Sequence, residues 1–170
     1  MNSSNGPIGL FDSGVGGLTV ARAIARRLPK EDILYFGDTA HLPYGEKSPD
    51  SIRKFSLEIA NHLIKKGAKI IVIACNSASA IAYEFLSEKL DIPVFNVIDP
   101  IIQELEKCKS QNIGIWGTRA TINSNVYQKK LKKSLPNAKV RSTATPLLVP
   151  LIEENQLKGN ITESLIKYYL

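Results

Sequence analysis

A cysteine followed at once by residues that start helices is the first feature of this sequence that could carry chemistry. Cys75 ends the apolar run 70–74 and precedes Asn76, Ser77 and Ser79. Such side chains accept hydrogen bonds from backbone amides, so the pattern predicts a thiol where a buried strand becomes a helix. The N–H groups and dipole of a helix N-terminus favour a thiolate, so we expect the pKa of Cys75 to fall towards neutrality. The alternative is a small buried hydrophobic residue.

Polar side chains also gather after three other predicted strands. These segments are 12–14 after strand 8–11, 38–45 after strand 32–36, and 118–121 after strand 112–116. The carboxyl ends of parallel strands meet at one edge of a sheet, where α/β proteins bind their ligands. Hydroxyls, an amide and helix N-terminal N–H groups suit a carboxylate, while Asp12 and Asp38 could receive an ammonium group. Each segment alone is an ordinary cap or turn, but together they predict a site for a small polar molecule.

The elements that must position these residues alternate regularly between strand and helix. Apolar patterning predicts strands at 8–11, 32–36, 70–74, 94–98, 112–116 and 139–144, with helices at 18–28, 52–64, 77–90, 101–107, from the 117–121 loop to 134, and from 146 and 161. Ser48 or Asp50 caps the second helix, and Gly67 ends it. We expect an α/β fold with parallel sheets covered on both faces. Asp99-Pro100 is the predicted hinge between a first domain, 1–98, and a second, partial domain, 99–170.

Composition excludes several classes of protein. The 22 basic and 16 acidic residues give a net charge of +6, and much of the excess lies in 129–141, where a lysine-rich outer helix face explains it. This charge is too mild to predict nucleic-acid binding. Cys75 and Cys108 indicate neither a disulfide framework nor a metal site. The start MNSSNG lacks the features of a signal peptide, and no apolar run reaches roughly eighteen residues, so we expect a soluble cytoplasmic protein without membrane contact.

Two competing motifs are incomplete. The segment 14–19 has the first two glycines of the dinucleotide-binding G-x-G-x-x-G pattern, but Thr19 occupies the third position, and no P-loop lysine follows. Asp38 lies about where a ribose-binding acid would, so dinucleotide binding stays an alternative. A Ser-His-Asp hydrolase would need a G-x-S-x-G motif, which is absent. Of the two histidines, we expect His41 to shape its loop and His62 to be structural or exposed.

Four longer motifs follow one another along the chain. They are FDSGVGGLTV from Phe11, GDTAHLPYG from Gly37, ACNSASA from Ala74 and GTRATINS from Gly117. In order and spacing they closely resemble the glutamate racemases of the aspartate/glutamate racemase superfamily, and the resemblance covers nearly all of residues 7–165, including PLLVPLIEE. It implies the two-domain α/β fold of that superfamily, the second domain being incomplete here. It also implies an isomerase that interconverts L- and D-glutamate without pyridoxal phosphate, another cofactor or a metal, and so supplies D-glutamate for peptidoglycan, cell-wall biogenesis and cell shape.

The resemblance also implies roles for individual residues. In this family two cysteines face opposite sides of the substrate, because the carbanion is planar and inversion needs an acid on each side. Cys75 is one of them. By the same resemblance, Asp12 lies near Cys75 and assists its proton transfer. Asn76 and Ser77 hold the polar ends of the substrate. The further substrate contacts are Ser13, Pro43, Tyr44, Gly45 and Thr118, and Thr121 is a less direct candidate.

One part of the family pattern is missing from this sequence. The second cysteine of the family lies in a Gly-Cys-Thr-His stretch, which is absent here, and the lysine-flanked Cys108 does not replace it. We therefore expect a truncated or partial racemase that is inactive in racemisation alone. A racemase for aspartate or another amino acid, or a catalytically dead amino-acid-binding fragment, remains the alternative. The expected partner is a small molecule, glutamate. The sequence does not determine the oligomeric state, and a homodimer is one of the open alternatives.

Overall fold

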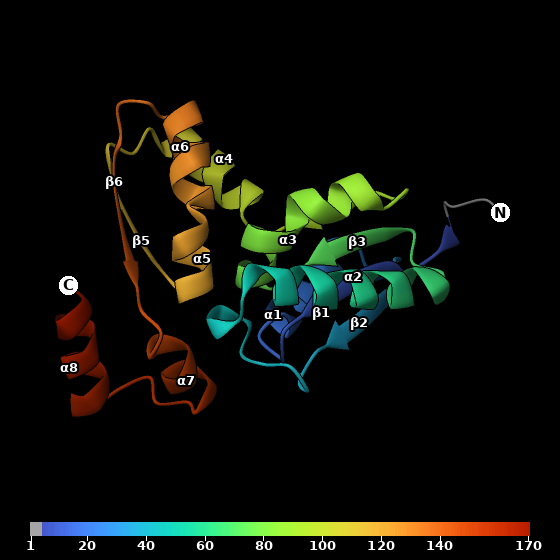
Figure 1. The fold of residues 1–170 in the computed structure, drawn as a ribbon, viewed down its shortest axis with the longest axis horizontal. Helices are drawn as coiled ribbons and strands as arrows, with labels where there is room; N and C mark the ends of the chain where they lie inside the picture. Colours follow the sequence, from blue (N-terminus) through green and yellow to red (C-terminus); the bar gives the residue numbers. More distant parts are fainter. Residues whose placement is uncertain (1–4) are drawn as a thin grey trace.

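Two parallel sheets with helices packed against them make up the fold (Figure 1). The computed structural model describes residues 5–170. The segment MNSSNG, for which no signal peptide is predicted, lies partly outside these described residues. The strands are β1 Ile8–Asp12, β2 Ile33–Gly37, β3 Ile70–Ile73, β4 Val94–Asn96, β5 Asn112–Gly117 and β6 Lys139–Ala144. The helices are α1 Leu18–Arg27, α2 Pro49–Lys65, α3 Asn76–Lys89, α4 Asp99–Cys108, α5 Arg119–Ser124, α6 Val126–Ser134, α7 Leu148–Glu153 and α8 Asn160–Tyr169. The predicted parallel α/β class is confirmed.

The first sheet has four parallel strands in the order β2-β1-β3-β4. Every residue of the central strand β1 is buried. Alternate side chains point to opposite faces of a strand, so Leu10 packs with α1 residues such as Ile24, whereas Phe11 packs with Ile52 of α2 and Leu86 of α3. The prediction that helices cover both faces is therefore confirmed for this sheet.

The second sheet consists of β5 and β6 and is covered differently. Ile113 and Ile115 point into a cluster with Tyr127 and Leu131 of α6, to which α4 also contributes. The alternate residues of β5 point the other way, and Trp116 is 41% exposed. Within residues 5–170 this face is covered less completely, although the Tyr169 ring of α8 lies 6.5 Å from the Trp116 ring between centroids. The prediction of two covered faces is confirmed only in part here.

Several predicted boundaries change because of local hydrogen bonds. Ser48, not Asp50, caps α2, since its Oγ accepts from the Ser51 N–H at 3.2 Å. β4 is shorter than predicted, because Asn96 Oδ1 accepts from the N–H groups of Ile98 and Asp99, at 2.8 and 2.9 Å, and begins α4. The predicted hinge Asp99-Pro100 is thus the first turn of a helix. The domain boundary that it was meant to mark stays a prediction.

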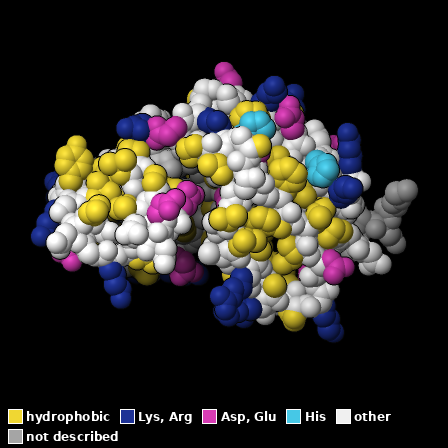
Figure 2. Space-filling view, turned by 90° about the horizontal axis from the view of Figure 1, so that it is seen from below, with side chains coloured by type: hydrophobic (Ala, Val, Ile, Leu, Met, Phe, Trp, Pro, Cys, Tyr) yellow, Lys and Arg dark blue, Asp and Glu magenta, His cyan; other side chains and the backbone are white. Residues whose placement is uncertain are grey.

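The loop predicted after β5 is mostly helical. α5 begins at Arg119, and the helix expected to run to Ser134 is interrupted at Asn125, which adopts a left-handed conformation with φ of 56°. Near the other end of the chain, α7 and α8 form as predicted, and apolar residues gather on their surface, at the left of Figure 2. None of the helices in residues 5–170 is long and apolar enough to cross a membrane.

Candidate active site

A pocket of about 540 Å³ lies where the carboxyl ends of β1 and β3 meet the start of α5. It is lined by most of the residues that the sequence predicts as catalytic or substrate-binding: Asp12, Ser13, Pro43, Tyr44, Gly45, Cys75, Asn76, Ser77 and Thr118. Thr121 is buried behind Thr118 and does not line the pocket. Residues from both sheets therefore share one cavity, as the position of the loops at strand ends predicts.

Cys75 occupies the N-cap position of α3, as its place between strand and helix predicts. Its Sγ accepts from the Ala78 N–H at 3.4 Å and donates to Ser13 Oγ at 3.5 Å. Only 6% of the residue is exposed, and burial, followed by the charge of Asp12, raises the pKa of the thiol. The hydrogen bonds with Ser13 and Ala78 lower it but do not outweigh these causes. The predicted fall of the Cys75 pKa towards neutrality is therefore wrong: the pKa of the buried thiol is raised above its ordinary value.

Asp12 organises the glycine-rich loop after β1. Its Oδ2 accepts from the N–H groups of Gly17 at 2.9 Å and Gly14 at 3.3 Å. A Cβ on Gly17 would lie 2.7 Å from the Asp12 Cβ and 2.8 Å from the Ala74 Cβ, so the loop can close only over a glycine. These N–H groups hold a carboxylate of the protein itself in the place where a nucleotide phosphate would bind. This geometry argues against the dinucleotide-binding alternative.

Asp38 points away from the pocket. Its carboxylate accepts from the Tyr44 hydroxyl at 2.6 Å and pairs with His41 Nδ1 at 2.8 Å. Burial and the bond to Asp38 raise the pKa of Tyr44 above its usual value. The His41 ring stacks on Phe55 with 4.1 Å between centroids. Asp38 thus fixes the turn that brings Tyr44 to the pocket, and the predicted use of Asp38 for an ammonium group is not supported.

A chain of hydroxyls joins the starts of α3 and α5. Ser77 Oγ lies 2.8 Å from Thr118 Oγ1, which in turn donates to Thr121 Oγ1 at 3.1 Å. Thr118 also caps α5 by accepting from the Thr121 N–H at 3.3 Å. Two predicted substrate contacts, far apart in the sequence, are therefore hydrogen-bonded neighbours.

Sequence reasoning missed part of the pocket wall. Arg119 and Glu46 form an ion pair of 2.7 Å at the pocket, and α7 contributes Val149 and Glu153. The PLLVPLIEE motif was the available signal for α7, but it carried no residue role. Tyr127, which bonds to Asn76, had no sequence signal at all.

The remaining candidates lie elsewhere. Cys108 is exposed at the end of α4 and forms no disulfide, and His62 packs edge-on against Phe36 at 5.7 Å between centroids. Within residues 5–170 no group of His, Cys, Asp and Glu side chains is arranged to hold a metal ion.

Comparisons with known proteins agree with this geometry. The model of the Asp/Glu/Hydantoin racemase family matches residues 8–167. The glutamate racemase of Aquifex pyrophilus is 51% identical over 164 residues, which are 96% of this chain and 64% of that protein. A crystal structure of glutamate racemase from Francisella tularensis in complex with D-glutamate superposes with a TM-score of 0.92 at 44% identity and covers 98% of this chain and 62% of that one. The aspartate racemase of Picrophilus torridus, with a TM-score of 0.63 and 18% identity, shares the fold alone. The chain spans less than two thirds of the length of these glutamate racemases, and it belongs to the Asp/Glu/Hydantoin racemase family.

Proposed function

We propose that this chain carries the glutamate-binding pocket and one catalytic thiol of a cofactor-independent glutamate racemase. The observation that carries the proposal is the buried Cys75 thiol at the start of α3, in a pocket of about 540 Å³ that Asp12 and the hydrogen-bonded Ser77 and Thr118 also line. The similarity to a glutamate racemase bound to D-glutamate supports the choice of substrate. For the whole protein we propose the supply of D-glutamate to peptidoglycan, and hence a role in cell-wall biogenesis and cell shape, in the cytoplasm.

The proposed chemistry begins with activation of the thiol. Burial and, after it, the negative charge of Asp12 disfavour a Cys75 thiolate. A bound amino acid brings a positive ammonium group, which offsets that charge and makes ionisation of Cys75 easier. The hydroxyl of Ser13, which accepts from Cys75 and keeps its own hydrogen, can donate to a carboxylate oxygen of the substrate, and Ser77 can do so by turning its hydrogen away from Thr118. Binding the correct ligand therefore also prepares the base.

The thiolate then removes the α-proton. The Cα–H bond breaks, the proton passes to sulfur, and the electron pair delocalises into the α-carboxylate to give a planar carbanion. Return of a proton from the same sulfur restores the original enantiomer, whereas a proton from an acid on the opposite face inverts it. Cys108 does not line the pocket, so the thiols of this chain support exchange with retention.

Proton exchange in D₂O tests the proposal directly. We expect the chain to replace the α-proton of one glutamate enantiomer by deuterium, followed by NMR, while chiral chromatography shows retained configuration. Cys75→Ala should abolish the exchange, and Cys108→Ser, which changes an exposed residue outside the pocket, is the matched control that should retain it.

Other outcomes separate the alternatives. Exchange of aspartate without glutamate would favour a different amino-acid racemase. Calorimetric binding of glutamate without exchange would favour the catalytically dead binding fragment. If the chain neither binds glutamate nor exchanges its α-proton, the proposed function is wrong. Racemisation by the chain alone would show that a second acid, on the face of the substrate opposite Cys75, is present.

A further inference from the structure

Asn76, the residue next to the proposed catalytic thiol, is held by a side chain from the other sheet. Its Nδ2 donates to the Tyr127 hydroxyl at 3.1 Å, and that hydroxyl lies 3.4 Å from Asn76 Oδ1, to which it donates. Asn76 is exposed and lines the pocket, whereas Tyr127 is only 7% exposed and belongs to the cluster of α6 and β5. A buried phenol thus reaches from the core of the second sheet to the start of α3.

This contact limits what the amide can do. The terminal torsion of an asparagine has a broad, nearly two-fold energy profile, so an unrestrained amide in water presents its N–H groups and its oxygen in either order. The Tyr127 hydroxyl uses one N–H group and one lone pair of Asn76, and leaves the other N–H group and lone pair free for a ligand. Fixing a polar group before the ligand arrives reduces the entropy lost on binding.

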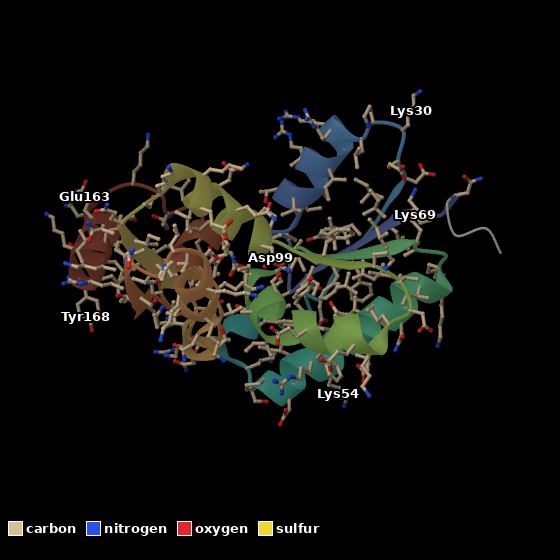
Figure 3. All side chains as sticks on the ribbon, turned by 90° about the horizontal axis from the view of Figure 1, so that it is seen from above. Lys30, Lys54, Lys69, Asp99, Glu163 and Tyr168 are labelled. Atoms are coloured by element: carbon tan, nitrogen blue, oxygen red, sulfur yellow. The ribbon has the colours of Figure 1, made fainter. Side chains whose placement is uncertain are left out.

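The helix that carries Tyr127 is itself anchored to the first sheet. Lys130, on the same helix, bonds through Nζ to Asp99 Oδ1 at 2.7 Å, and the other oxygen of Asp99 accepts from Asn96 at 2.8 Å at the end of β4. Figure 3 labels Asp99 near the middle of the molecule, where α4 starts. Because this second anchor is independent of the phenol, loss of the Tyr127 hydroxyl alone should free the Asn76 amide without displacing α6.

We propose that Tyr127 is a positioning residue: through its hydrogen bonds it sets the orientation in which the Asn76 amide meets a polar end of the amino-acid substrate. The inference rests on the proposed function, because it takes Asn76 as a substrate contact. Burial raises the pKa of Tyr127, although its bond with Asn76 lowers it, so the phenol is neutral at physiological pH and can both donate and accept.

Tyr127→Phe removes the hydroxyl and keeps the ring in its cluster. We expect the apparent KM for α-proton exchange of glutamate to rise by roughly three- to tenfold, the loss of one net hydrogen bond. The kcat should change by less than about twofold, because the thiol keeps its hydrogen bonds with Ser13 and Ala78. Tyr83→Phe is the matched control: Tyr83 lies on α3 and its hydroxyl forms no hydrogen bond within residues 5–170, so KM should stay as in the unmodified chain.

A double-mutant cycle with Asn76→Ala separates positioning from general structure. If Tyr127 acts through Asn76, the effect of Tyr127→Phe on KM disappears when Asn76 is already alanine. An equal effect in both backgrounds, or a lower melting temperature with unchanged KM, would overturn the inference.

A second measurement does not depend on the substrate. The side-chain NH₂ signals of Asn76 in ¹⁵N NMR should show slowed hydrogen exchange that is lost in Tyr127→Phe. Unchanged exchange would refute the positioning role even if glutamate binds. Lost protection, in a chain that neither binds nor exchanges glutamate, would instead place the failure in the proposed function.

Discussion

The two sheets differ in how completely their faces are covered, and the proposed chemistry lies with the better covered one. The four-stranded sheet buries all of β1 between helices on both faces. The two-stranded sheet packs Ile113 and Ile115 against α4 and α6 and exposes Trp116 on the other side. Cys75 follows β3 of the first sheet, whereas Thr118, which also lines the pocket, follows β5 of the second.

This difference indicates a division of tasks. A base that must face the α-carbon needs a fixed position, and dense packing supplies it because side chains in a close-packed core cannot move independently. The second sheet supplies hydrogen-bonding groups, through Thr118 and Tyr127, that meet the first at the pocket. The comparison can be tested by changing matched residues in the two regions.

The largest expected difference is between two fully buried leucines. Leu86 in α3 packs in the core of the four-stranded sheet and Leu131 in α6 in the cluster of the two-stranded sheet, and both are 0% exposed. We expect Leu86→Ala to lower the free energy of unfolding by about 3–5 kcal/mol and Leu131→Ala by about 2–3 kcal/mol, because a one-sided cluster collapses more easily around a cavity. Urea titration measures both. Equal losses would contradict the proposed difference in packing.

The next comparison is between Gly17, beside the four-stranded sheet, and Gly114, in the two-stranded sheet. A Cβ on Gly17 would meet Asp12 and Ala74 at under 3 Å, whereas a Cβ on Gly114, on the open side of β5, would have no atom within 4 Å. Gly17→Ala should therefore cost about 1–3 kcal/mol of unfolding free energy, and Gly114→Ala should be neutral or slightly stabilising. Thermal unfolding of the two variants, side by side, checks this. A destabilised Gly114→Ala would show that the open face is covered in solution.

Alkaline pH should weaken the first region. Burial and nearby negative charges raise the pKa of Tyr35 to about 12, and the pKa values of Cys75 and Tyr44 are also raised, chiefly by burial. In the unfolded chain these groups ionise at their ordinary pKa values of 9.0 and 10.0, while the folded chain keeps their protons. Their stabilising contribution is therefore complete below about pH 9 and declines as the pH rises towards about 12.

Urea titrations at several alkaline pH values measure this decline. Tyr35→Phe and Cys75→Ser each remove one of the titrating groups, so each should flatten the dependence of unfolding free energy on pH. If the slope of unfolding free energy against pH is unchanged in both variants, ionisation of these buried groups is not the cause of the decline.

The smallest expected effect concerns a buried hydroxyl without a hydrogen-bond partner, beside the four-stranded sheet. Ser56 Oγ, in α2, is the one buried side-chain polar atom without a hydrogen-bond partner within the described residues. Ser56→Ala should raise the free energy of unfolding by about 0.5–1 kcal/mol. Ser79→Ala is the matched control in α3 and should lower it by about 1 kcal/mol, because its Oγ donates to the Ile73 carbonyl at 3.0 Å. A loss of stability in Ser56→Ala would mean that a partner is present in solution.

Much of the fold could be predicted because its signals are local. Apolar patterning placed all six strands, and a capping serine and a glycine with φ of +93° placed the ends of α2. Predictions failed where the hydrogen bonds of one polar side chain decide the local structure, because apolar patterning does not report them. Asn96 shortens β4 through its own side chain, and Asp38 turns from the pocket because Tyr44 and His41 bind it.

The sequence by itself determined that Cys75 lies between a strand and a helix, and that polar loops surround it, because residue type and spacing encode both. Only the tertiary structure decided the state of that thiol. Its pKa rises rather than falls, since burial and Asp12 act against the helix start, and local sequence shows neither how strongly each acts nor that Asp12 lies close to Cys75. The tertiary structure also brought Ser77 to Thr118 and Asn76 to Tyr127, pairs 41 and 51 residues apart, because such contacts depend on how the two sheets pack.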